Sequence, residues 1–477
     1  MTTVPADPRV LGLVVVRAAD PEAFEAWRAR GKATGWCRHP VRLAGSSLQV
    51  DQDSGEVRST FSSYDQPDQV LLKSCGQRRA TSCPSCSAVY RVDAFQLVAA
   101  GLRGGKGVPE EVASHPAVFF TLTAPSFGSV HSRREHDGRP RICRPQGQGC
   151  CSHGHPCRCL IVHQTDDPVL GEPICPECFD CEGAVIWNAL ASELWRRTTI
   201  GIRRHLAGLA AISRSALKDH VRLSFTKVVE YQRRGVVHVH AVARLDGASD
   251  DLVPSPAPFG ADLLAGAIHR AVRAASVSYP DSPGLSGVAR WGDQLDVHVL
   301  GSDGHPPGAA AAYLAKYATK STEPAGLLDH RLRAGDLERL GTLLSPHLAR
   351  MVRTAWDLGA RPELEHLRLR AWAHCLGFRG HWLTKSRAYS TTFGALRAVR
   401  HDWHARRQGG ASHSSPLVSV TDWSFVGRGW LSLGDAWLAE TAAAEAAEAR
   451  KLAREERRST ITGTGQMPTE KDGDGRA

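Results

Sequence analysis

Two histidines stand one residue apart in the stretch GVVHVHAV, at positions 238 and 240. The β-branched neighbours predict a strand, in which alternate side chains share a face. His238 and His240 then point the same way, about 7 Å apart along the strand. A strand face that carries two imidazoles indicates either a pair of hydrogen-bonded histidines or two metal ligands.

The chain just before these histidines predicts a third ligand. Two β-rich runs flank the short link RRG, which reads as a hairpin with Gly235 in the left-handed conformation. In that register Gln232 pairs with Val236, and Glu230 lies opposite His238. Two imidazoles and a carboxylate suit Mn²⁺ or Mg²⁺ at a working site. A slip of one residue would turn Glu230 to the other face, and Gln232 is then the alternative ligand.

A pair of tyrosines further along predicts a nucleophile. In AAYLAKYATK, Tyr313 and Tyr317 are spaced i, i+4 on one face of an expected helix, and Lys316 stands beside them. A phenol attacks poorly at neutral pH because its pKa is near 10. A divalent ion that polarises a phosphate, with Lys316 as electrostatic support, makes that attack feasible. The alternative is an amphipathic helix with two packing tyrosines.

The cysteines predict structural zinc. Twelve of the 13 cysteines lie between residues 37 and 181, and C-x₂-C pairs in this region have the spacing of tetrahedral zinc sites. We expect two zinc ions, or three, with unmetallated thiols as the alternative. The first predicted set is Cys37, Cys75, Cys83 and Cys86. The second is Cys151, Cys157, Cys175 and Cys178, with Cys143, Cys150, Cys159, Cys181, His153 and His155 as competing ligands.

Charge and composition indicate a nucleic-acid partner. The net charge is +10, and the window from His366 to Arg407 alone holds eight Arg and one Lys against one acid, with six aromatic residues between them. Basic side chains with interleaved aromatics suit phosphates and bases. A solvated basic helix with core aromatics is the alternative. The residues expected to contact DNA are Arg379, Lys385, Arg387, Arg397 and Arg400.

The hydrophobic pattern predicts an α+β fold. Strands expected at 118–123, 221–232, 236–245 and 294–300 alternate with helices at 183–210, 260–276 and 308–321, which gives a mainly antiparallel central sheet covered by helices. No apolar run reaches the ~20 residues that span a bilayer, and the first residues lack a basic signal region, so we expect a cytoplasmic protein without a membrane partner. The expected domains are an N-terminal zinc-binding region (1–115), a central domain (116–325) with a Cys-rich insertion (131–181), a basic, mostly helical region (326–437), and a charged helix with a disordered tail (438–477).

These motifs together resemble the HUH endonucleases, and more closely the RepSA-type replication initiators of actinobacterial plasmids and integrative elements. The resemblance rests on the stretches HPAVFFTLTAPSFGSVHS, GAVIWNALASELWRRTTI, VEYQRRGVVHVHAV, AAYLAKYATK and LTKSRAYSTTFGALR, and with the upstream Cys cluster it runs from about residue 35 to 400. It implies an HUH sheet, a divalent metal, and nicking of a double-strand origin by Tyr313 or Tyr317 in rolling-circle replication.

Three functions remain open from the sequence. The first is a rolling-circle initiator that nicks and rejoins DNA through a 5′-phosphotyrosyl link. The second is an HUH relaxase or transposase with the same chemistry, and the third is a non-catalytic zinc-finger regulator of DNA. No nucleotide-binding G-x₄-GK[ST] pattern occurs, so we expect a host helicase and a host polymerase as partners.

Overall fold

The computed structural model describes residues 7–66, 68–279, 286–301, 307–320, 328, 330–407 and 417–463. The chain forms two compact units. One combines residues 1–89 with 411–477, and the other comprises residues 90–410. These boundaries differ from the expected ones near 115 and 325, because the N-terminal segment pairs with a strand from the C-terminal part of the chain.

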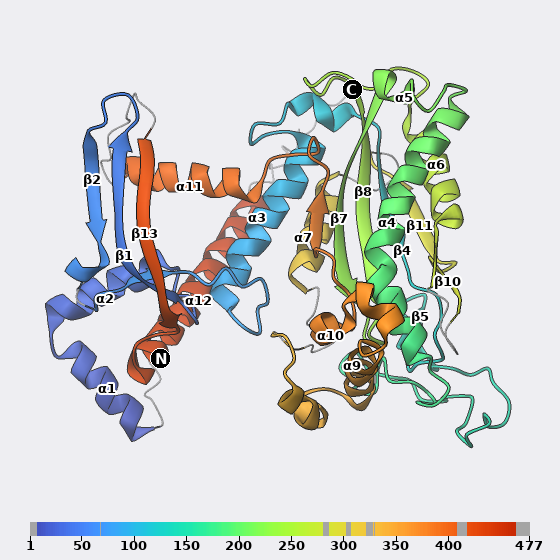
Figure 1. Cartoon of the computed structure of the whole chain (residues 1–477), viewed down its shortest axis with the longest axis horizontal. Coiled ribbons are helices and arrows are strands. Elements are labelled where there is room, and N and C mark those ends of the chain that lie inside the picture. The colour runs from blue at the N-terminus through green and yellow to red at the C-terminus, as the bar shows by residue number, and fades with distance from the viewer. Residues whose placement is uncertain are drawn as a thin grey trace, which may run out of the picture. The chain divides into compact units, whose positions relative to one another are not determined.

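The larger unit is built on a five-stranded sheet in the order β11-β4-β8-β7-β12, in which every neighbouring pair is antiparallel. This confirms the expected mixture of helices with an antiparallel central sheet. Figure 1 shows the long β7 and β8 at the middle of this sheet. The strands are β4 (Ala117–Leu122), β7 (Val221–Tyr231), β8 (Val237–Gly247), β11 (Leu295–Val299) and β12 (Leu383–Lys385).

Helices cover both faces of this sheet. On one face α4 (Cys181–Leu209) and α6 (Ala261–Ala274) pack through apolar residues at helical spacing onto strand residues such as Val229, Val239 and Ala241. On the other face α7 (Pro307–Lys320) and the larger unit's part of α3 (Pro84–Arg103) pack on Val228 and Val242. Figure 1 shows α4 and α7 on opposite sides of β7 and β8. His238 and His240 lie on the sheet face that α7 covers, because they alternate along β8 with Val239 and Ala241, which pack on the α4 side.

The β7–β8 hairpin has the predicted register. Glu230 pairs with His238, and the turn closes with Gln232 N donating to the carbonyl of Val236 at 2.9 Å. Gly235 has φ +80°, a left-handed value that favours glycine, and a Cβ there would lie 2.6 Å from Met351 Sδ. The buried Asn188 of α4 holds the turn in place, since its Nδ2 donates to the carbonyl of Gly235 and its Oδ1 accepts from Val237 N.

The Cys-rich insertion has little regular structure, as its composition predicts. Its strands β5 (Arg134–His136) and β6 (Arg139–Arg141) form a short exposed hairpin. Further isolated bridges join Val130 to Pro173, and Arg144 to Cys159. The backbone therefore brings distant cysteines and histidines together without a large apolar core.

The rest of the larger unit is made of short elements and two longer helices. The strand β12 adds the segment after residue 380 to the central sheet, next to β7. These elements are α5 (Leu217–His220), β9 (Ser276–Ser278), β10 (Val288–Arg290), α8 (Leu340–Leu343), α9 (Pro346–Leu358), α10 (Leu369–Trp372) and α11 (Phe393–Arg407), with 3-10 turns at Glu110–Ser114, Ala334–Arg339, Pro362–Leu367 and Ala373–Cys375.

The smaller unit contains a second antiparallel sheet. Its order is β13-β1-β2, and β3 also pairs with β1. The strand β13 falls in a region expected to be mostly helical, where that expectation is wrong: the alternating LVSVTDWSFV pairs along the whole of β1. The elements are α1 (Pro8–Ala18), α2 (Pro21–Ala33), β1 (Val41–Asp51), β2 (Val57–Ser62), a 3-10 turn at Ser63–Asp65, β3 (Leu71–Lys73), β13 (Leu417–Arg428) and α12 (Leu433–Gly463).

Candidate functional site

Glu230, His238 and His240 converge on the sheet face that α7 covers. One ligand atom from each lies within 4.8 Å of the other two. His240 Nε2 is 3.2 Å from Glu230 Oε1, and His240 Nδ1 is 3.2 Å from Thr121 Oγ1 on the neighbouring β4. Thr121 pairs with His240 across the ladder and so orients its ring. This group of two imidazoles and one carboxylate has the donors to hold a divalent ion.

The environment of His238 keeps its imidazole neutral, which is the form that binds metal. Burial lowers the pKa of His238 to about 3, with further lowering by the nearby His240 and Arg234. His238 Nδ1 is also buried and has no hydrogen-bond partner among the residues that the structure describes. A buried polar atom without a partner is costly, and a bound cation would satisfy it.

The two tyrosines of α7 lie over His240. The ring centroid of His240 is 5.1 Å from that of Tyr313 and 4.9 Å from that of Tyr317. The two phenol rings are 4.5 Å apart, and Phe119 of β4 contacts the edge of Tyr313. The i, i+4 spacing on one helix thus delivers both phenols to the same side of the imidazole pair.

The phenol groups differ in their surroundings. Tyr313 is 38% exposed, and its pKa is raised by burial of the hydroxyl, by Tyr317, and by the charges of Glu230 and Asp296. Lys316 Nζ lies 5.6 Å from the ring centroid of Tyr317. The Tyr313 phenol therefore ionises with difficulty when no cation is nearby. The ammonium group of Lys316 lies beside the other phenol, Tyr317.

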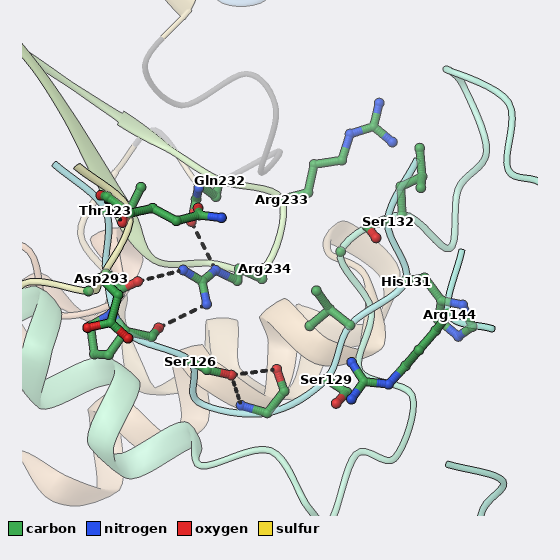
Figure 2. Close-up of a pocket in the computed structure, with 18 of the residues that line it drawn as sticks. Thr123, Ser126, Ser129, His131, Ser132, Arg144, Gln232, Arg233, Arg234 and Asp293 are labelled. Carbon is green, nitrogen blue, oxygen red and sulfur yellow. Dashed lines mark hydrogen bonds between the residues drawn. The ribbon is translucent and has the colours of Figure 1, made fainter. Parts of the chain in front are cut away.

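A pocket of about 1070 Å³ opens at the turn end of the hairpin (Figure 2). Arg234 extends into it and donates to Gln232 Oε1 at 2.9 Å and to the carbonyls of Pro125 and Ala124. Figure 2 shows Arg144 and His131 across the pocket from Arg234. Gln232 thus lines the pocket, and Glu230 is the residue grouped with the two histidines. The arginines of the lining are Arg133, Arg144, Arg233, Arg234 and Arg290, against one acid, Asp293.

Comparison with known proteins places the chain in a family. The model of the RepSA family, described as "Replication initiator protein, pSAM2", matches residues 23–444. The chain belongs to the RepSA family of replication initiators. It is 39% identical over 466 residues to a replication initiator protein of Streptomyces ambofaciens, covering 94% of this chain and 96% of that protein. No solved structure matches it significantly. Within the described residues, every helix is too short or too polar to cross a bilayer.

The basic residues expected to contact DNA lie at separate places in this RepSA-family chain. Lys385 lies on β12 opposite Thr226, so it shares the sheet face of the histidines. Arg379 and Arg387 are exposed. On α11, Arg397 stacks on Phe393, and Arg400 forms an ion pair with Asp93. The high charge of this region is therefore spread over several elements, and the charge of Arg400 is already paired.

The four cysteines of the first predicted zinc set come together in the smaller unit. Cys75 Sγ is 3.6 Å from Cys86 Sγ, and Cys83 Sγ is 3.9 Å from Cys37 Sγ. Zinc bonds of about 2.3 Å to sulfur give tetrahedral edges of about 3.8 Å, which these distances match. The backbone amide of Cys75 donates to Cys37 Sγ, an arrangement that stabilises a thiolate. The group has the donors and geometry of a closed zinc site.

The second predicted set is brought together in part. Cys151, Cys175 and Cys178 lie close to one another, and the fourth member is His153 instead of Cys157. His153 Nδ1 is 3.4 Å from Cys178 Sγ. A tight turn explains the choice, since Cys151 N donates to the carbonyl of His155 and folds His153 back toward the thiols. The C-x-H spacing of this turn was the available sequence signal. Cys150, Cys157 and Cys181 belong to no such group within the described residues.

Proposed function

We propose that this protein initiates rolling-circle replication of a plasmid or integrative element by nicking and rejoining one DNA strand through a phosphotyrosyl intermediate. The proposal rests on one observation: Tyr313 and Tyr317 lie over His240 on the sheet face that also carries His238 and Glu230. Nucleophile and metal ligands come from elements far apart in sequence. On this proposal the five-stranded sheet is that of an HUH endonuclease, and residues 116–325 form the nicking domain.

The residues that would hold the catalytic Mn²⁺ or Mg²⁺ are His238, His240 and Glu230. Their fit is supported by the unpartnered buried Nδ1 of His238 and by the mixture of nitrogen and oxygen donors. A divalent ion bound there supplies charge that polarises the scissile phosphate and stabilises the anionic transition state. Thr121 fixes the ring of His240, and the surrounding sheet excludes water from one side of the site.

The reaction is a transesterification. The phenolic oxygen of Tyr313 or Tyr317 forms a bond to phosphorus, and the bond from phosphorus to the 3′ oxygen breaks. The proton lost by the phenol is balanced by the one gained by the released 3′ hydroxyl, so no external reactant is needed. Lys316 supports the developing charge. Because the two rings are 4.5 Å apart, one tyrosine can hold a strand while the other attacks.

The path of the DNA follows from charge. The pocket at the hairpin turn is lined by five arginines, and these suit the phosphates of a single strand. We assign contacts with the double-strand origin to the basic residues Arg379, Lys385, Arg387, Arg397 and Arg400. Structural zinc would be held by two groups, Cys37, Cys75, Cys83 and Cys86 in the smaller unit, and Cys151, His153, Cys175 and Cys178 in the insertion. Unwinding and synthesis are left to a host helicase and polymerase.

The decisive experiment is a covalent-adduct assay with the full chain. The protein is incubated with an oligonucleotide from its own element's origin and Mn²⁺, and the mixture is denatured before electrophoresis. We expect a protein–DNA adduct that requires Mn²⁺ and is lost in the Tyr313→Phe/Tyr317→Phe variant. Each single variant then shows which phenol makes the first cut.

The matched control is Tyr279→Phe, a change outside the tyrosine pair, which should leave the adduct intact. An adduct that persists in the double variant would refute the tyrosine assignment. An adduct formed only with a transfer origin or an element end would identify a relaxase or transposase. Binding without any cleavage would identify a non-catalytic regulator.

A further inference from the structure

Four side chains of the Cys-rich insertion converge at a place separate from the two groups described above. They are His131, Cys143, Cys159 and His163, and one ligand atom from each lies within 4.8 Å of the others. His131 Nδ1 is 3.2 Å from His163 Nε2, and His163 Nε2 is 3.5 Å from Cys159 Sγ. Tetrahedral zinc, with bonds of about 2.0 Å to nitrogen and 2.3 Å to sulfur, has ligand edges of about 3.3–3.6 Å for these atom pairs. We propose that these residues form a third, Cys₂His₂ zinc site.

The backbone builds this site from two pairs of neighbouring segments. Arg144 and Cys159 exchange both backbone hydrogen bonds, and Cys143 N donates to the carbonyl of Ile161, so the two cysteines are set side by side. His131 N donates to the carbonyl of Glu172, and Gly171 N donates back to the carbonyl of His131. These pairings join residues that are between 15 (Arg144 and Cys159) and 41 (His131 and Glu172) positions apart, and they bring the four ligands together.

The surroundings support the ligand role of each group. His163 Nδ1 lies 2.6 Å from Asp167 Oδ2, which fixes the tautomer and turns Nε2 toward the cluster. A carboxylate behind a ligating histidine is the usual support of a zinc site. Ser132 N donates to Cys143 Sγ at 3.2 Å, as amides do to bound thiolates.

Burial and charge also fit a zinc ion. Cys143 and His163 are 3% and 2% exposed. Two thiolates neutralise the charge of Zn²⁺, so the ion can be buried here without an unpaired charge. The insertion has no large apolar core of its own, and metal binding supplies the folding free energy that such segments lack.

The position of the site links it to the pocket of Figure 2. His131 itself lines that pocket, and so do Arg133 and Arg144, which follow closely on His131 and Cys143 in sequence. On the other side, Arg233 of the β7–β8 turn donates to the carbonyls of Thr165 and Asp167, the residue that supports His163. A zinc ion at this site would hold the arginines of the pocket wall in place against the hairpin. This second role rests on the proposed function, whereas the metal site does not.

The test is ¹¹³Cd NMR of the full chain after its metals have been exchanged for ¹¹³Cd, because the chemical shift of ¹¹³Cd depends on the number of sulfur ligands. We expect three cadmium resonances from sulfur-containing sites, in the order Cys₄, Cys₃His and Cys₂His₂, and three equivalents of zinc bound at these sites in the untreated protein. The Cys159→Ser/His163→Ala variant should lose one equivalent and only the Cys₂His₂ resonance. Absence of that resonance from the wild-type protein would refute the site without reliance on any variant.

A matched variant in the same insertion controls for nonspecific effects. Cys150 and His136 are exposed and outside all metal groups of the described residues, so Cys150→Ser/His136→Ala should keep three equivalents. Loss of zinc from this control as well would contradict the assignment. In the Cys159→Ser/His163→Ala variant we expect single-strand affinity to fall several-fold. Three resonances in a protein that never forms a DNA adduct would leave the zinc site standing and refute the nicking function.

Discussion

Glu230 Oε1 lies 3.2 Å from His240 Nε2, although the strand ladder pairs Glu230 with His238. The carboxylate therefore leans along the sheet toward the tyrosines and can complete the ligand group with both imidazoles. We expect Glu230→Gln to weaken Mn²⁺ binding and to lower the rate of adduct formation about 10–100-fold, with DNA affinity unchanged. Manganese titration calorimetry and the adduct assay measure the two effects.

The exposed Glu445 of α12 offers the same substitution away from the triad. Glu445→Gln should leave manganese affinity and cleavage at wild-type levels. If Glu230→Gln binds Mn²⁺ as tightly as the wild type, Glu230 is not a ligand.

Gly235, with its left-handed backbone conformation, sets the register of the β7–β8 hairpin, and replacing it tests that role. A methyl group at this φ of +80°, placed 2.6 Å from Met351 Sδ, strains the turn. We expect Gly235→Ala to lower the free energy of unfolding by about 1–3 kcal/mol and to reduce Mn²⁺ affinity, since Glu230 and His238 depend on that turn. Urea unfolding followed by circular dichroism gives the first value.

Gly208→Ala is the matched control, because this glycine lies in α4 with open space around it. There alanine should keep or slightly raise stability, by up to about 1 kcal/mol. Equal losses at the two positions would contradict the argument from backbone conformation.

Lys227 carries a buried charge on the sheet face opposite the histidines. Burial lowers its pKa to about 8, and its Nζ lies 5.5 Å from the ring centroid of Trp195. Lysine in the unfolded chain titrates near 10.4, so between these values the unfolded state binds more protons and stability rises with pH. We expect Lys227→Met to raise the free energy of unfolding at pH 7 by about 1–3 kcal/mol.

The same variant should also remove the rise in stability between pH 8 and 10 that the wild type shows. Urea midpoints at pH 7 and pH 9.5 measure both effects. If the wild type instead loses stability relative to Lys227→Met as the pH rises from 8 to 10, the predicted sign of the pH dependence is wrong.

Arg144 tests the pocket as a phosphate site. It lines the pocket of Figure 2 and is exposed to solvent. We expect Arg144→Gln to weaken single-stranded DNA binding several-fold and to reduce the slope of log affinity against log salt by about 1. Arg134 of β5 is an exposed arginine of the same insertion that does not line the pocket. Arg134→Gln should leave the slope unchanged, and equal effects of the two variants would show that only net charge matters.

Much of the β7–β8 hairpin could be predicted because its conformation depends on residues that are close together in the sequence. Alternation of β-branched residues, a three-residue link and one glycine are enough to fix which residue pairs with His238, because side-chain direction and turn type depend on neighbouring residues alone. The helical spacing of Tyr313 and Tyr317 is local in the same way. The sequence therefore predicted His238, His240 and the two phenols, and it left the third ligand open between Glu230 and Gln232.

Contacts between residues far apart in the sequence could not be predicted and became visible in the folded chain. Thr121 reaches His240 through the pairing of β4 with β8, and β13 joins β1 across most of the chain. His153 takes the place expected for Cys157, and His131 and His163 join two cysteines that the sequence left as spares. In a segment without periodicity, ligand choice depends on backbone hydrogen bonds between distant loops, and these leave no regular pattern in the order of the residues.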